Sequence, residues 1–361
     1  MTGPFHRFAW LLLLMLCACG GSSTSSGTDA RGVGVLTTSI RDEARDRTLP
    51  VEVWYPTESA GTPSDVLDFE RGDRRATLAP LLEAAPSECV ARTTTATRDA
   101  PAIAGDYPLV LYTHCYTCTR WSAHAVIERL VSEGFVVVSA DHEGDTLFDA
   151  LAGTQSDLTN ELVDIREADV RVLLDQVLDG GVLPEGVAAI PSQVGLLGHS
   201  IGSVTAGRVA QNDMRITAVL GMAAPMENIL YGEVSMENIE IPVGMIEATE
   251  DNSIGAIGNT FIEQNFEVAN TPAYKLDIVD AGHWSVTNIA GLTEGFAAGC
   301  GDGERQTNGE PFTYIGVSEA IDYTASFAAA FFAAHVLDDA EALELLRSNP
   351  WPSAAPLQVR E

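Results

Sequence analysis

The sequence predicts an α/β fold with a doubly wound, mostly parallel sheet and two antiparallel edge strands near its N-terminus. From Tyr107 onward, short and wholly apolar runs alternate with amphipathic segments. Strands of this composition are buried on both faces, which is typical of a parallel sheet covered by helices. Before Tyr107, the segments 34–39 and 49–54 alternate apolar and polar residues, as half-buried antiparallel strands do. A glycine-flanked serine also stands between one apolar run and an Ala/Val-rich segment.

Each apolar run is assigned to one strand, and the segments between the runs are assigned to helices. The expected parallel strands are 109–113, 135–140, 194–197, 216–220, 243–248 and 274–279. The expected helices are 122–133, which ends at Gly134, then 160–178, 203–211 and 320–337. Asp322, Thr324, Ser326 and His335 interrupt the last of these, so we interpret it as a buried closing helix rather than a membrane anchor. In open sheets of this kind, binding sites lie at the carboxyl ends of the strands.

The N-terminus is typical of an export signal. His6 and Arg7 precede a short apolar run at 8–16, which is followed by Leu-Cys-Ala-Cys ending at Cys19. This ending resembles the bacterial lipobox, and the resemblance implies that Cys19 is lipidated and becomes the first residue of the mature chain. An ordinary signal peptidase site nearby is the alternative. The lipobox implies a secreted, cell-envelope lipoprotein of the outer membrane or periplasm, which contacts the membrane only through its anchor.

Composition then divides the chain into four parts. We expect a lipoprotein signal peptide at 1–18, a flexible Gly/Ser-rich linker at 19–32, one catalytic domain at 33–337, and a C-terminal helix and tail at 338–361. The expected oligomeric state is a monomer.

The charge balance excludes one class of partner. Acidic residues number 51 against 20 basic ones, for a formal net charge of -31. Nucleic acid is therefore not an expected partner, because binding its phosphates requires positive charge.

A strand, a tight turn and a helix surround the candidate nucleophile. Gly198-His199-Ser200-Ile201-Gly202 directly follows the apolar run 194–197 and directly precedes a predicted helix. This context resembles the nucleophile elbow of α/β-hydrolases, where the serine sits in a strained turn and the flanking glycines avoid collisions. The motif makes Ser200 the candidate nucleophile.

A serine hydroxyl needs a general base and a carboxylate that orients the base, and the elbow fold supplies them in the order Ser, acid, His. His283 lies just after the last predicted parallel strand and is the candidate base. Asp251, after the strand 243–248, is the candidate acid. Glu250 is the next candidate, and Glu247 is weaker because it belongs to the strand itself.

Two backbone N–H groups should form an oxyanion hole for the reaction. One comes from Ile201, and the other comes from Cys115 or Tyr116 in the loop 114–120. This loop resembles the His-Gly-x-x-Gly loop of many α/β-hydrolases, with Cys115 and Cys118 in place of the glycines.

The cysteine replacement indicates a disulfide between Cys115 and Cys118, because C-x-x-C spacing can close when the backbone turns. Cys89 and Cys300 would then pair as the remainder or stay free, and a bond from Cys300 to Cys115 or Cys118 is the competing connectivity. A thioredoxin-like redox role for the pair is the functional alternative.

With these residues in place, most of the mature chain resembles bacterial proteins similar to platelet-activating-factor acetylhydrolases and dienelactone hydrolases. The similarity runs through 47–56, 108–114, 128–137, the elbow and Gly282-His283. Tyr116-Thr117 and 250–254 also resemble cutinase-like polyester hydrolases, a comparison in which the acid could align on Asn252. The resemblance implies ester hydrolysis without a cofactor, on small-molecule or lipid esters such as short-chain acyl phospholipids or polyesters.

Two functions from different classes follow from these observations. The first is a serine esterase that acts through Ser200, Asp251 and His283. The second is a non-catalytic, lipid-anchored surface binding protein that retains the hydrolase fold. No metal site is expected, since Cys115 and Cys118 supply only two ligands at zinc spacing.

Overall fold

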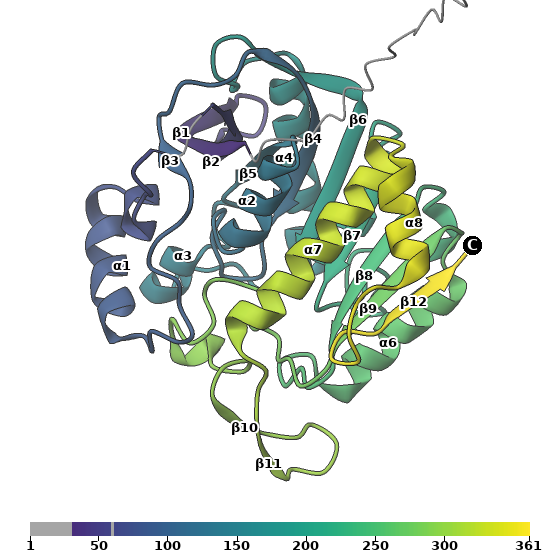
Figure 1. Ribbon diagram of the computed structural model, residues 1–361. Helices are drawn as coiled ribbons and strands as arrows, with labels where there is room; N and C mark the ends of the chain where they lie inside the picture. The colour runs from purple at the N-terminus through teal and green to yellow at the C-terminus, as the bar shows by residue number, and fades with distance from the viewer. Residues whose placement is uncertain (1–30, 59–60) are drawn as a thin grey trace, which may run out of the picture.

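The computed structural model describes residues 31–58 and 61–361 and contains one large twisted sheet (Figure 1). The sheet has ten strands in the order β12-β9-β8-β7-β6-β4-β5-β2-β1-β3. The expected signal peptide, the lipidated Cys19 and nearly all of the expected linker lie outside the described residues.

The strands of this sheet are β1 (Gly32–Asp42), β2 (Arg47–Thr57), β3 (Thr97–Arg98), β4 (Gly105–Thr113), β5 (Val136–Ala140), β6 (Val187–His199), β7 (Ala218–Met222), β8 (Val243–Ala248), β9 (Ala273–Ile278) and β12 (Leu357–Arg360). Strands β4 to β9 are all parallel to their neighbours within this group. Their side chains are almost all buried apart from residues 188–193 in the first half of β6, which explains why wholly apolar runs identify them. The predicted fold class is confirmed.

The two N-terminal strands pair as expected. β1 pairs antiparallel with β2 along its whole length, and β2 pairs antiparallel with β5. The short strand β3 extends the sheet beyond β1 and was not predicted, because two residues carry no periodic signal.

Helices cover both faces of the sheet (Figure 1). One hydrophobic core joins the sheet to α1, α2, α7 and α8, and a second core joins the other face to α4, α5 and α6. The helices are α1 (Gly72–Ala84), α2 (His124–Ser132), α3 (Leu147–Ala152), α4 (Asn160–Leu178), α5 (Ile201–Asn212), α6 (Gly255–Val268), α7 (Val317–Val336) and α8 (Ala340–Ser348). Short 3₁₀ helices lie at η1 (Val66–Phe69), η2 (Met236–Asn238) and η3 (Glu294–Phe296).

The apolar C-terminal helix α7 is buried against the sheet, as predicted. Its core residues include Phe327, Phe331 and Phe332, which are fully buried. Within the described part of the chain, no helix is long and apolar enough to cross a membrane.

Two elements near the C-terminus differ from the expectation. The predicted tail contains β12, which pairs antiparallel with β9 and so belongs to the sheet. A separate hairpin consists of β10 (Asp302–Glu304) and β11 (Pro311–Thr313), which lie between β9 and α7 in the chain. This hairpin projects away from the sheet (Figure 1). Both hairpin strands are mostly exposed and only three residues long, so neither gives a hydrophobic pattern.

Candidate active site

The elbow is built from β6 and α5, and Ser200 is the single residue between them. Ser200 has φ 57° and ψ -124°, a backbone conformation that is rare for residues with a side chain. A Cβ on Gly198 would lie 2.2 Å from the Gly202 carbonyl oxygen, and a Cβ on Gly202 would lie 2.2 Å from the Thr113 carbonyl oxygen. Both glycines are therefore required for the close approach that holds Ser200 at the carboxyl end of the sheet.

Ser200, His283 and Asp251 form a continuous chain of hydrogen bonds. The Ser200 Oγ lies 2.9 Å from Nε2 of His283, and Nδ1 of His283 lies 2.6 Å from Oδ2 of Asp251. Asp251 is fully buried and His283 nearly so, which shields the bond between them from water, while Ser200 lines an open cavity. The fold thus brings together the three side chains that the sequence selected, and the arrangement can take a proton from the serine hydroxyl.

The loop after β8 orients the Asp251 carboxylate. Its Oδ1 accepts hydrogen bonds from the backbone N–H groups of Ser253 and Ile254, at 2.9 and 3.0 Å. Such a turn is a common use of aspartate, and it leaves Oδ2 directed at His283.

The other candidate acids have different partners. Glu250 accepts hydrogen bonds from Arg305 and from the backbone N–H of Gln306, at 2.7 and 2.9 Å. Glu247 pairs with Lys275. Asn252 donates to the Tyr314 hydroxyl at 2.7 Å.

The hairpin β10–β11 reinforces this region in a way that the sequence analysis missed. Arg305 bonds to both Glu250 and Asp280, which precede the Asp251 and His283 positions in their respective loops. Its guanidinium also lies 4.5 Å from the centre of the Phe312 ring. No local sequence pattern marks this contact, because the hairpin is distant in sequence from Glu250.

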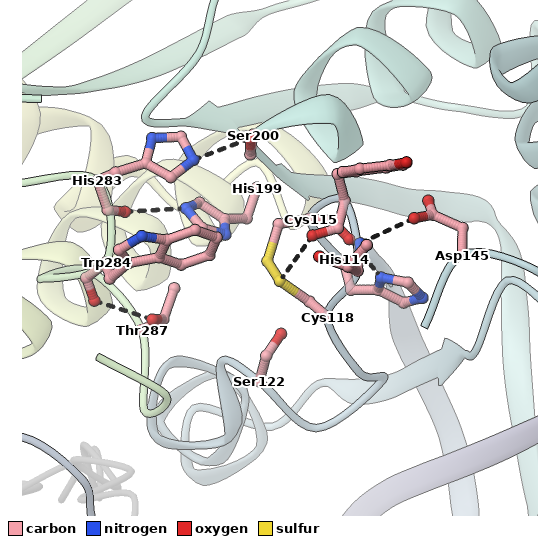
Figure 2. The surroundings of a disulfide bond; sticks show 12 residues. His114, Cys115, Cys118, Ser122, Asp145, His199, Ser200, His283, Trp284 and Thr287 are labelled. Atoms are coloured by element: carbon pink, nitrogen blue, oxygen red, sulfur yellow. Dashed lines mark hydrogen bonds between the residues drawn. A yellow bond between two sulfur atoms is a disulfide. The ribbon is translucent and has the colours of Figure 1, made fainter. Parts of the chain in front are cut away.

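His199 is not hydrogen-bonded to Ser200 but supports the loop that carries His283. Its Nε2 lies 3.1 Å from the His283 carbonyl oxygen, and its ring packs against His283 and Trp284, with centroids 5.0 and 5.6 Å away (Figure 2). Burial and the neighbouring His283 hold the pKa of His199 well below its usual value. A neutral His199 can therefore donate to the backbone of His283.

The predicted oxyanion loop lies beside Ser200 (Figure 2). Tyr116 lines the same cavity as Ser200 and Ile201, whereas Cys115 is fully buried and does not line it. Ile201 is the first residue of α5, where a backbone N–H has no partner within the helix. Among the described residues, no protein group accepts a hydrogen bond from the N–H of Tyr116 or of Cys115. The place of Tyr116 in the cavity lining favours it over Cys115 as the second donor.

Two disulfide bonds are present in the part of the chain that the structure describes. Cys115 bonds to Cys118 within the oxyanion loop, and Cys89 bonds to Cys300 across 211 residues (Figure 2 shows the first). This is the connectivity favoured from the sequence, and the competing bond from Cys300 to the loop is absent.

A cavity of about 290 Å³ opens beside Ser200. Its lining contains no residue with a formal charge among those that the structure describes, and it includes Tyr116, Leu158, Val204, Leu230, Ile254 and Phe261. At its rim, Leu230 and Ile257 are 64% and 66% exposed, and the neighbouring Ile229 is 76% exposed. The opening of the cavity is therefore mainly apolar and carries no formal charge in its described lining, although the chain as a whole has a net charge of -31.

Two comparisons with known proteins found similarity to this chain. Residues 67–227 match the model of the chlorophyllase family. The ferulic acid esterase from Streptomyces cinnamoneus has a solved structure that is similar over 94% of this chain and 98% of its own, with a TM-score of 0.67 and 19% sequence identity. The chain has the α/β-hydrolase fold. A search of curated protein sequences found no match.

The α/β-hydrolase fold accounts for where the candidate residues lie. Ser200, Asp251 and His283 follow strands β6, β8 and β9, whose carboxyl ends meet at one edge of the sheet. The finer resemblance to platelet-activating-factor acetylhydrolases and dienelactone hydrolases stays a prediction.

Proposed function

We propose that this chain is a serine hydrolase that cleaves carboxylic esters through an acyl-enzyme intermediate. The observation that carries the proposal is the hydrogen-bond chain from Ser200 through His283 to Asp251. The match of residues 67–227 to the chlorophyllase family and the structural similarity to the ferulic acid esterase support it.

In the proposed mechanism, Ser200 Oγ attacks the ester carbonyl carbon while His283 Nε2 takes the hydroxyl proton. The Asp251 carboxylate stabilises the resulting imidazolium. The carbonyl oxygen becomes an anion that accepts hydrogen bonds from the N–H groups of Ile201 and Tyr116. The carbon–oxygen bond to the alcohol then breaks, and the alcohol leaves with the proton from His283. Water repeats these steps on the acyl-enzyme and releases the carboxylic acid and free Ser200.

Of the two substrate classes that the resemblance implies, phospholipids and polyesters, the cavity favours the neutral and apolar esters. A phospholipid carries a phosphate, which proteins usually recognise with Arg or Lys. The described lining of the cavity supplies neither, and its exposed rim is aliphatic. A polyester, or another water-insoluble neutral ester, fits this surface better than a phospholipid does.

The proposed location is outside the cytoplasm, with an acyl anchor on Cys19. Two disulfide bonds support the location, because such bonds persist in oxidising compartments. The second candidate, a non-catalytic binding protein, gains no specific support, since a binding surface has no need of an oriented Ser-His-Asp chain.

The proposal is tested with Ser200→Ala and a panel of p-nitrophenyl esters of increasing acyl length. We expect the substitution to lower kcat by up to ~10⁶-fold and to abolish labelling by a fluorophosphonate, while the fold is retained. Ser348→Ala, which changes a serine on the exposed helix α8, is the matched control and should behave like the unmodified protein. Activity of Ser200→Ala close to that of the unmodified protein would overturn the proposal.

A further inference from the structure

A buried ion pair lies directly behind the predicted oxyanion loop. Arg166 comes from α4, and Asp145 comes from the loop that follows β5. Both side chains are fully buried, and a guanidinium nitrogen of Arg166 bonds to Oδ2 of Asp145. Burying two charges is costly unless they are paired and their remaining hydrogen-bonding groups are also satisfied. The remaining contacts of this pair therefore indicate what it does.

The ion pair holds the oxyanion loop on both sides of Cys115 and Tyr116. On the near side, Arg166 Nη2 donates to the His114 carbonyl oxygen. On the far side, Oδ1 of Asp145 accepts a hydrogen bond of 2.8 Å from the Thr117 N–H. Thr117 has φ 56°, which is rare for a β-branched residue, so this bond compensates an unfavourable backbone conformation. The peptide N–H groups between these two points are fixed in direction.

The same arginine reaches the other oxyanion donor. Arg166 Nε donates to the Thr205 hydroxyl at 3.1 Å, and this hydroxyl donates to the Ile201 carbonyl oxygen at 3.0 Å. Through Thr205, Arg166 is therefore connected to the first residue of the helix that follows Ser200. One guanidinium thus bonds directly to the oxyanion loop at His114 and is connected to Ile201 through Thr205.

We propose that Arg166, in its ion pair with Asp145, is a positioning residue that sets the separation and direction of the Tyr116 and Ile201 N–H groups. It does not touch the substrate and acts only through the loop and through Thr205. This inference rests on the proposed ester hydrolysis. Such positioning matters because an oxyanion hole must be arranged before the reaction begins, and a displacement of about 1 Å near the reacting atoms can cost ~10²-fold in rate.

The test uses Arg166→Lys and the double variant Arg166→Met with Asp145→Asn. Lysine keeps the positive charge but cannot bond to His114, Asp145 and Thr205 together. The double variant removes both charges, which avoids leaving an unpaired buried carboxylate that would itself unfold the protein. Arg171→Lys, on the same helix but with an exposed side chain, is the matched control.

The measurements separate positioning from folding. The concentration of reactive sites is first counted by complete labelling of one portion of the protein with a fluorophosphonate. The turnover of an unlabelled portion is then divided by this concentration to give kcat per labelled site. We expect kcat to fall roughly ten- to a hundredfold for both test variants with KM nearly unchanged, and the affinity for a trifluoromethyl ketone to fall by the same factor. That inhibitor forms a tetrahedral oxyanion on serine, so its binding reports the donors directly.

A normal kcat per labelled site in both variants would overturn the inference, even if their stability were lower. A fall in kcat without a fall in ketone affinity would overturn it as well, because the oxyanion donors would then be intact. Failure of the proposed function itself is distinct, since Ser200→Ala would then keep its activity.

Discussion

Glu250 and Asp251 are adjacent carboxylates that serve different partners. Asp251 is fully buried and bonds to His283, while Glu250 bonds to Arg305 in the β10–β11 hairpin. The order of motifs along the chain was sufficient to rank Asp251 first. The partner of Glu250 could not be predicted, because Arg305 is 55 positions away in sequence and lies in a segment without a hydrophobic pattern.

Substitution of each carboxylate by its amide tests the assignment of the acid. Asp251→Asn should lower kcat by about 10⁴-fold, because an amide cannot hold the correct imidazole tautomer or stabilise its cation. Glu250→Gln and Glu247→Gln are the matched controls and should change kcat by less than about tenfold. Steady-state kinetics on one p-nitrophenyl ester decides the matter. A larger loss for Glu250→Gln than for Asp251→Asn would show that the acid is assigned one position too late.

Single residues that belong to a sequence motif were predictable, and residues that act through long-range contacts were not. Ser200 and His283 follow from the elbow and from the chain order of the fold. Arg166 bonds to groups 21, 39 and 52 positions away, and nothing near it in the sequence distinguishes it from a surface arginine. Its role depends on two loops that only the folded sheet brings together.

Among the elements, the buried parallel strands and the helices α2, α4, α5 and α7 were predicted, whereas α1, α3, α6 and the short exposed strands were not. The apolar runs located β4 to β9, and the bounds expected for α4 coincide with those observed. β3, β10, β11 and β12 have two to four residues each and leave too few positions for a period to emerge.

The oxyanion loop is held by the Cys115–Cys118 disulfide bond as well as by the Arg166–Asp145 pair. The double variant Cys115→Ser with Cys118→Ser should lower kcat roughly tenfold, because the loop that carries the Tyr116 N–H gains freedom. Ser200 should still react with a small fluorophosphonate. Dithiothreitol should reproduce the loss in the unmodified protein, and kinetics before and after reduction measures it.

The same reduction applied to the double variant is the control, since Cys89–Cys300 is the one disulfide bond left there among the described residues. A further large fall in kcat in that experiment would assign the redox effect to Cys89–Cys300 and contradict the role given to the loop.

Across the whole molecule, the Cys89–Cys300 bond connects two segments that follow different parts of the sheet. Cys89 lies after α1. Cys300 lies in the segment 279–316 between β9 and α7, an insertion that carries the β10–β11 hairpin. The architecture of two helical layers on one sheet was predictable from the order of patterns. The placement of this insertion against the segment after α1 was not, because it depends on packing between distant surfaces.

Removal of this bond should affect stability more than catalysis. It closes a loop of 211 residues, so Cys89→Ala with Cys300→Ala should lower the free energy of unfolding by up to about 5 kcal/mol on the chain-entropy model. Urea denaturation of the unmodified and variant proteins provides the measurement, and kcat per labelled site should stay within about threefold. An unchanged denaturation midpoint would show that the insertion is held by packing alone.

The contrast between the uncharged cavity and the acidic surface has a consequence for the end of the proposed reaction. A neutral ester enters a cavity whose described lining carries no formal charge, and a carboxylate is formed there. The chain as a whole carries a net charge of -31, so its field repels this new anion. No cation in the described lining holds the anion back. On the proposed function, the protein would attract its substrate by apolar contact and repel its product by charge, and accumulated acid would slow the next turnover only where salt screens that repulsion.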